Sequence, residues 1–259
     1  MAEIFYKSAK ISVGNEFFNK LKEISKDLGI DPKDLLLVMA SESGLNPSAR
    51  NAGGGAAGIN QMMPQTLLGL GFGKDLTPQE RSLAYSKLKG EDQLEYFKKY
   101  LEANKPPTGY RNAVDIYLAN ALPICFSLPG VRNQDPNAII CTKNKNLPQT
   151  YPNISKELEA KYYDGLSLFD TNKDGSITYG DFVKYVNGLK NNPTYIEGVG
   201  KLQSSDNTTQ ELSSTESTEP SELPEVPDVE ESIKLPEIPE ISWVLSTKAW
   251  IISKNSFSS

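Results

Sequence analysis

The chain has 259 residues, of which 27 are Lys or Arg and 33 are Asp or Glu, and its formal net charge is −6. It contains no histidine, which excludes Ser-His-Asp and Cys-His nucleophilic catalysis and histidine-ligated zinc. Any acid–base chemistry must therefore use carboxyl groups.

The negative charge is concentrated near the carboxyl terminus. Residues 201–259 hold eleven Asp or Glu and four Lys, so the remainder of the chain is close to neutral. No basic stripe is present, and we expect no nucleic-acid partner. The amino-terminal sequence MAEIFYKSAK lacks the pattern of a secretory signal, and no segment reaches the roughly 20 apolar residues of a membrane span. We expect no export by the usual route and no membrane span.

Residues 1–150 are predicted to form a mainly helical domain. An apolar stripe at helical spacing predicts the first helix and consists of Phe17, Leu21, Ile24 and Leu28. A second helix is predicted to begin after Asp31 as N-cap, with Pro32 in its first position, and to end at Gly44.

Glu42 lies at the end of this second helix, in Ser41-Glu42-Ser43-Gly44. It follows Leu35, Val38 and Met39 by seven, four and three positions, so it shares their helical face. Burial and the negative end of the helix dipole both disfavour a carboxylate, and we expect a raised pKa, as a general acid requires. Taken alone, a Glu near a helix end is usually a surface residue, and the motifs that follow decide between these readings.

Further helices are predicted after a Gly-rich loop. Pro64 opens one, and Thr77-Pro78-Gln79-Glu80 forms a capping box for the next. The apolar faces of two more helices consist of Leu94, Phe97 and Leu101, and of Val114, Tyr117, Leu118 and Ala121. Residues 124–154 are rich in Pro, Asn and Gly and are predicted to be loops that precede a second helical unit at 151–200.

Three separated motifs occur in order in the first domain: Glu42-Ser43-Gly44, then Gly58-Ile59-Asn60-Gln61, then Met63-Pro64-Gln65-Thr66. They resemble the lytic transglycosylase family with the lysozyme-like fold, whose members show Glu-Ser-Gly, a Gly-Leu-Met-Gln-like turn and Met-Pro-x-Thr. The resemblance covers roughly residues 15 to 125. It implies a long cleft for the glycan strands of bacterial peptidoglycan.

The resemblance also implies roles for individual residues. Glu42 would be the single catalytic acid and then base, Ser43 would position it or the sugar, and Gln61 would donate a hydrogen bond in the cleft. Gly58 would let the backbone approach the sugar closely. The altered residue of the second motif, Asn60, would replace an apolar contact by a polar one.

A further motif of the family, Ala-Tyr-Asn, corresponds to Leu118-Ala119-Asn120 in this chain. This segment keeps Asn120 as a substrate-binding residue but lacks the tyrosine. Tyr117 is the candidate to replace it. The segment Tyr117 to Pro123 resembles phage virion members of the family, which implies a phage tail or baseplate component.

No second acid lies within helical reach of Glu42, although Asp115 or Glu95 could approach it through folding. The resemblance implies a single-acid reaction, without a cofactor, in which the N-acetyl group stabilises the cation and a 1,6-anhydro sugar forms. Two alternatives remain open: hydrolysis, as in goose-type lysozymes, and a structural virion protein with a degenerate glycan-binding cleft.

Residues 170–181 match the EF-hand calcium loop. The ligands would be Asp170, Asn172, Asp174, the backbone carbonyl of Ser176, and Asp181, with Gly175 at the sharp turn. Asp181 stands where Glu is usual, so we expect weaker calcium binding or greater tolerance of magnesium. The ion would stabilise structure, and a turn without metal is the alternative.

The two cysteines and the carboxyl-terminal region complete the sequence predictions. Cys125 and Cys141 either pair or remain as two buried thiols, and they do not fit a metal spacing.

Residues 201–240 are predicted to form an extended, disordered-like acidic linker rich in Pro, Glu, Ser and Thr. Residues 241–259 form a short apolar anchor or docking segment, which would bind phage tail proteins. We expect synthesis in the host cytoplasm and action on the cell wall in the periplasm.

Overall fold

The computed structural model describes residues 11–51 and 55–211, and over these ranges the protein is mainly helical, as predicted. A two-stranded antiparallel sheet is the one sheet in the described ranges. The α-helices are α1 (Asn15–Leu28), α2 (Pro32–Ser43), α3 (Pro64–Gly69), α4 (Pro78–Tyr85), α5 (Gly90–Ala103), α6 (Ala113–Ala121), α7 (Pro129–Arg132), α8 (Lys156–Leu166), α9 (Tyr179–Leu189) and α10 (Pro193–Glu211). The remaining elements are the 3-10 helices η1 (Pro123–Ser127) and η2 (Ser167–Phe169) and the strands β1 (Ile139–Thr142) and β2 (Ser176–Thr178).

The helix boundaries form where the sequence places its capping residues. The Asp31 carboxylate accepts a hydrogen bond from the Lys33 backbone N–H at 2.8 Å, and Gly44 ends α2 in the left-handed conformation with φ 66°. Thr77 and Glu80 form the predicted capping box of α4. These local predictions are confirmed.

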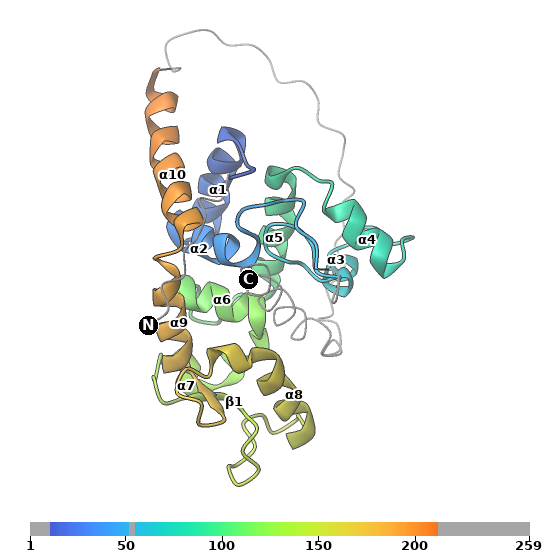
Figure 1. Ribbon diagram of the computed structural model, residues 1–259, viewed down its shortest axis with the longest axis vertical. Helices are drawn as coiled ribbons and strands as arrows, with labels where there is room; N and C mark the ends of the chain where they lie inside the picture. The colour runs from blue at the N-terminus through green and yellow to red at the C-terminus, as the bar shows by residue number, and fades with distance from the viewer. Residues whose placement is uncertain (1–10, 52–54, 212–259) are drawn as a thin grey trace, which may run out of the picture.

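Two helices are buried on all sides. In α2, every residue from Leu35 to Ser43 is buried, and in α6 every residue except Asn120 is buried. The four predicted apolar positions of α6 are all buried, and the other residues of this helix except Asn120 are buried with them, because neighbouring elements cover it from nearly all directions. Contacts with α2, α5, α9 and η1 surround α6, which lies at the centre of the molecule in Figure 1.

The segment predicted as loops, residues 124–154, contains regular structure. Within it lie most of η1, the short helix α7 and strand β1. Strand β1 pairs with β2, and Thr142 lies opposite Ser176. The Thr142 hydroxyl donates to the Gly175 carbonyl oxygen at 2.9 Å. The prediction that residues 139–142 form a loop is wrong, because this strand is stabilised by a partner strand more than thirty residues away.

One continuous hydrophobic core extends from Ile11 to Leu202, and includes residues from both predicted helical units. Helix α9 packs against α6, and α10 packs against α1 and α2. The boundary at residue 150 stays a prediction. The prediction of an extended linker from residue 201 is wrong for its first part, because residues 201–211 continue helix α10. The rest of the predicted linker and the predicted anchor at 241–259 lie outside the described residues.

Cys125 and Cys141 are both buried free thiols. Burial raises the pKa of each thiol well above its ordinary value, so both remain protonated at neutral pH and contribute as small core residues. Among the described helices, none is long and apolar enough to cross a membrane.

Candidate active site

Glu42 is 3% exposed and occupies the last turn of α2, where this helix meets α6. Its Oε1 accepts a hydrogen bond from Asn120 Nδ2 at 3.4 Å. The Tyr117 hydroxyl is a second hydrogen-bond partner of the Glu42 carboxyl group. The structure therefore brings together three of the predicted site residues from positions more than seventy residues apart in the chain.

The hydroxyl group of Tyr117 remains protonated beside Glu42. Burial, and then the negative charge of Glu42, raises the pKa of Tyr117 well above its ordinary value. Its oxygen also lies 3.4 Å from the Ser41 hydroxyl. Tyr117 thus supplies a neutral O–H group that can donate to a carboxylate but cannot compete with it for a proton at neutral pH.

The two carboxyl groups considered as a second acid are held in ion pairs. Asp115 is fully buried, and its two oxygens accept hydrogen bonds from the Arg111 side chain at 2.7 and 3.0 Å. Glu95 pairs with Lys20 on the surface between α5 and α1. Because both carboxyl groups are engaged with basic side chains, Glu42 is the candidate for both the acid and the base.

Ser43 joins the end of α2 to the turn that follows. Its hydroxyl donates to the Ile59 carbonyl oxygen at 2.8 Å and accepts from the Asn46 backbone N–H at 3.2 Å. This buried side chain therefore positions the segment that carries Glu42 relative to the turn. With one bond donated and one accepted, the hydroxyl has only an acceptor lone pair left for the other predicted role, contact with the sugar.

The second motif forms a tight turn between Ala57 and Met62. These two residues exchange backbone hydrogen bonds at 2.8 and 3.0 Å. Gly58 has φ 81°, a conformation that favours glycine, and a Cβ atom there would lie 2.4 Å from Gln93 Oε1 and 2.5 Å from a ring carbon of Tyr85. The predicted purpose of this glycine was access for the sugar. In the structure, it also gives room to two buried side chains.

Gln61 was predicted to be a hydrogen-bond donor in the cleft. Its Nε2 instead donates to the Gly58 carbonyl oxygen at 2.9 Å. Its Oε1 is buried and has no hydrogen-bond partner within the described part of the chain. The Gln61 amide is thus held against the turn, with its oxygen left without a hydrogen-bond partner in the described ranges.

Gln93 of α5 was not predicted as a site residue, although it organises the turn. Its Oε1 accepts from the Ile59 backbone N–H at 2.8 Å, and its Nε2 lies within 3.2 Å of the carbonyl oxygens of Pro47, Tyr85 and Leu88. The sequence carried a signal, since Gln93 lies four residues before Phe97 on the apolar face of its helix. A polar side chain on such a face is buried and must find partners.

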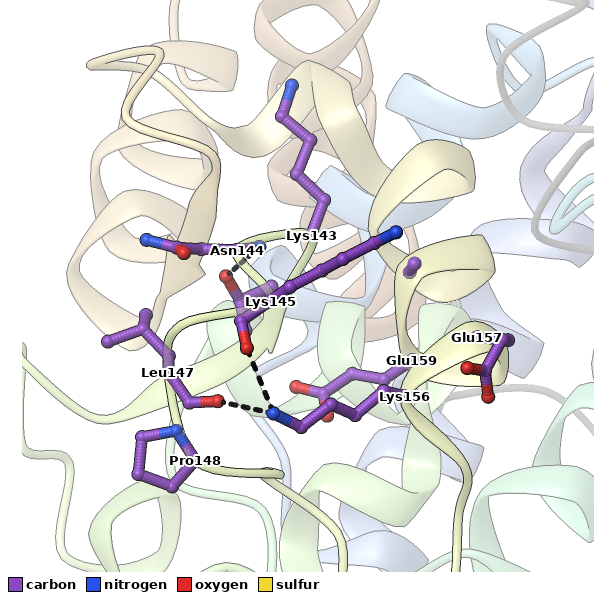
Figure 2. Close-up of a pocket in the computed structure, with 10 residues that line it drawn as sticks. Lys143, Asn144, Lys145, Leu147, Pro148, Lys156, Glu157 and Glu159 are labelled. Atoms are coloured by element: carbon purple, nitrogen blue, oxygen red, sulfur yellow. Dashed lines mark hydrogen bonds between the residues drawn. The ribbon is translucent and has the colours of Figure 1, made fainter.

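In the described part of the chain, two cavities lie away from Glu42. One, in Figure 2, lies beside β1 and α8, where the Lys156 ammonium donates to the carbonyl oxygens of Lys145 and Leu147 at 3.0 and 3.1 Å. The other is lined by residues that include Asp34, Asn112 and Tyr179. Neither cavity is lined by a predicted catalytic or substrate-binding residue.

The predicted calcium loop is held by hydrogen bonds between its own residues and to Tyr163. Asp170 Oδ2 accepts from the Gly175 backbone N–H at 3.0 Å and from the Tyr163 hydroxyl at 2.6 Å. Asp170 Oδ1 is buried and has no hydrogen-bond partner within the described ranges. Asn172 and Asp174 accept from the backbone N–H groups two residues further along, at 3.1 and 2.8 Å, which gives the loop its curvature.

The Asp181 side chain takes part in capping the start of α9. One carboxylate oxygen accepts from the Thr171 hydroxyl, and the other accepts from the backbone N–H and the hydroxyl of Thr178 in a capping box. Among the described residues, no group of three or more acidic, Cys or His side chains is gathered as a metal site. A cation would therefore have to draw these side chains inward around Asp170 Oδ1, a buried acceptor without a hydrogen-bond partner in the described ranges.

Comparison with known proteins gives one match, to a family model that covers part of the chain. Residues 19–85 match the family model described as the Transglycosylase SLT domain. This range includes Glu42, Ser43, Gly58 and Gln61, and it ends before α5 and α6. No curated protein and no solved structure matches the chain.

Gly58→Ala is expected to destabilise the fold by about 2 kcal/mol or more, because it combines a left-handed backbone with a close contact to Gln93 and Tyr85. Urea unfolding measures the change. Gly69→Ala is the matched control, since a Cβ at this helical position meets no atom within 4 Å. Equal stability of the two variants would show that the turn does not need glycine.

Proposed function

We propose that this protein is a lytic transglycosylase that cleaves the β-1,4 bond between N-acetylmuramic acid and N-acetylglucosamine in peptidoglycan, with Glu42 as acid and then base. The Transglycosylase SLT match supports the enzyme class and the peptidoglycan substrate. The observation that carries the assignment of Glu42 is its burial at the α2–α6 contact, beside Tyr117 and Asn120.

The environment of Glu42 suits the first chemical step. Burial favours the uncharged carboxylic acid, which has a proton to give to the glycosidic oxygen as the bond breaks. The donors of Tyr117 and Asn120 then stabilise the carboxylate that remains, since hydrogen bonds to the charged form favour it. The same side chains thus hold the carboxyl group in place through both protonation states.

A single carboxyl group can complete the reaction when the substrate supplies the rest. The N-acetyl group of the sugar stabilises the developing cation, and the Glu42 carboxylate accepts the proton of the sugar's own 6-hydroxyl group. The product is a 1,6-anhydro sugar, and no water is consumed. Hydrolysis by the usual route would need a second carboxyl group near the bond, whereas Asp115 and Glu95 are engaged with Arg111 and Lys20.

The unpartnered acceptor of Gln61 supports substrate binding near the turn. N-acetyl sugars present an amide N–H, and Gln61 Oε1 is a buried acceptor with no partner within the described residues. We propose that this pair forms in the complex. Gly58 and Ser43 contribute by fixing the turn and its connection to α2.

We also propose that residues 170–181 bind Ca²⁺ as a structural ion. Asp170 Oδ1, a buried acceptor without a described partner, supports this, together with the loop curvature set by the backbone bonds to Asn172 and Asp174. Ser176 would contribute its carbonyl oxygen. Asp181 would need to release Thr171 to reach the ion, which is consistent with weak binding.

Delivery on a phage particle is a further part of the proposal. The segment Tyr117 to Pro123 and the acidic, Pro-rich sequence that follows α10 support it, because the first resembles phage virion proteins and the composition of the second suits a flexible tether. Residues 241–259 would then bind a tail or baseplate protein, and the enzyme would act on the cell wall from the particle.

Glu42→Gln is expected to abolish cleavage of purified peptidoglycan, by about 1,000-fold or more in kcat, because the amide cannot transfer a proton. Turbidity clearance measures the rate, and mass analysis of products from the unaltered protein should show anhydro ends, lighter by one water than reducing ends. The control is Glu23→Gln on the exposed face of α1. Undiminished clearance by Glu42→Gln would refute the catalytic assignment, and reducing ends would indicate hydrolysis.

Calcium is expected to raise the melting temperature by roughly 5 °C when present at about 100 times its Kd, because it binds the folded loop. Differential scanning calorimetry with Ca²⁺ and with a chelator tests this. Asp170→Asn should remove the calcium-dependent shift. An unaltered protein that melts at the same temperature in both conditions does not bind the ion at this loop.

Truncation after Glu240 is expected to prevent incorporation into particles while the rate of peptidoglycan cleavage stays unchanged. Mass spectrometry of purified virions, with the full-length chain as control, measures incorporation. If the full-length chain is not found in particles of any phage that encodes it, the virion proposal fails without affecting the enzymatic one.

A further inference from the structure

Tyr117 has its hydroxyl beside Glu42 and its ring against the second helical unit. The ring of Phe169, in η2, lies 5.7 Å from that of Tyr117 at an angle of 71°. The ring of Tyr185, in α9, lies 6.0 Å away at 77°. Both are edge-to-face contacts, a geometry that restricts how an aromatic ring can turn.

The two rings that contact Tyr117 are themselves held in place. Phe169 and Tyr185 lie 4.6 Å apart, and Phe169 stacks on Phe182 of α9 with 4.2 Å between centroids and 10° between planes. Phe169 and Phe182 are fully buried. This cluster of Phe169, Phe182 and Tyr185, here called the aromatic cluster, is therefore a rigid support on one side of Tyr117.

The position of the Tyr117 hydroxyl bears directly on Glu42. Tyr117 and Asn120 are three residues apart on α6, so their side chains lie on one helical face and reach the Glu42 carboxyl group together. A rotation of the Tyr117 ring would move its hydroxyl away from the carboxyl group. Tyr117 is 1% exposed, so its place in the core is set by its neighbours.

We propose that Phe169 and Tyr185 are positioning residues for glycan cleavage, which act through Tyr117 to orient the Glu42 carboxyl group. The inference rests on the proposed function. It means that the second helical unit, which lies wholly outside the matched range 19–85, completes the active site. Neither residue is required to contact the substrate.

Tyr185 is the better residue to test, because it is partly exposed and its ring can be replaced with less damage to the core. Tyr185→Leu removes the edge-to-face contact, and Tyr185→Phe keeps it. We expect Tyr185→Leu to lower kcat about 10- to 100-fold at unchanged KM, as small misplacements of catalytic groups do. Tyr185→Phe should keep most of the activity.

The pH dependence of kcat gives a readout that packing alone would not change. Loss of the Tyr117 hydrogen bond removes a donor that stabilises the Glu42 carboxylate, which raises the pKa of Glu42. The part of the pH–kcat profile that reports this ionisation should therefore move to higher pH in Tyr185→Leu. Leu168→Ala is the matched control: it is next to Phe169 but 41% exposed, and both kcat and the pH profile should remain unchanged.

A double-variant cycle tests the route through Tyr117. Tyr117→Phe removes only the hydroxyl group, and the combination with Tyr185→Leu should reduce kcat no further than the larger single effect. Losses that multiply would overturn the proposed route. Unchanged kcat and pH profile in Tyr185→Leu, below its melting temperature, would overturn the role of the cluster.

These outcomes are separate from failure of the proposed function, which Glu42→Gln decides. If Tyr185→Leu does not fold, as judged by near-ultraviolet circular dichroism, Phe169→Leu is measured instead, because it removes the other ring contact of Tyr117 and keeps an apolar side chain at a buried position. A shifted pH profile with unchanged KM in that variant supports the proposal. A profile identical to that of the unaltered protein contradicts it.

Discussion

The contact between α2 and α6 is the interaction on which the rest of the site depends. It removes Glu42 from water and places the donors of Tyr117 and Asn120 against its carboxyl group. A carboxyl group buried without such donors would be costly in its charged form, and one with donors but exposed to water would give up its proton too early. Both conditions are met because both helices are buried on nearly all sides.

The turn after α2 is held by polar side chains inside the core. Gln93 accepts from the Ile59 backbone N–H, and Ser43 donates to the carbonyl oxygen of the same residue, so side chains from two helices hold both backbone polar groups of Ile59. Gly58 allows this arrangement, because its missing side chain leaves the space that Gln93 and Tyr85 occupy. Gln61 is then left with a buried acceptor suited to an amide group.

The second helical unit serves two functions in the proposed scheme. Phe169 directly precedes Asp170, the first residue of the proposed calcium loop, and its ring supports Tyr117. Strand β1 pairs with the strand of this loop, as Thr142 binds Gly175 and lies opposite Ser176. Phe169 and Asp170 therefore connect the proposed calcium loop to the core residue Tyr117, which lies beside Glu42.

Local structure followed from the sequence where the cause is local. The caps at Asp31 and Thr77 and the stop at Gly44 depend on residues within one helical turn, and they form as predicted. Strand β1 could not be predicted in this way, because its hydrogen bonds come from a distant segment. The position of Gln93 on an apolar helical face predicts that its side chain is buried. It does not predict which four backbone groups the side chain binds.

By itself, the sequence determined that Glu42 ends a helix, that no histidine takes part, and that motifs typical of a glycan-cleaving enzyme follow in order. Only the tertiary structure decided which groups surround Glu42. Asp115, a possible second acid, is neutralised by Arg111, while Tyr117 reaches the carboxyl group and rests on rings from α9 and η2. The physical reason is that such contacts depend on how helices cross, and spacing along the chain does not specify a crossing.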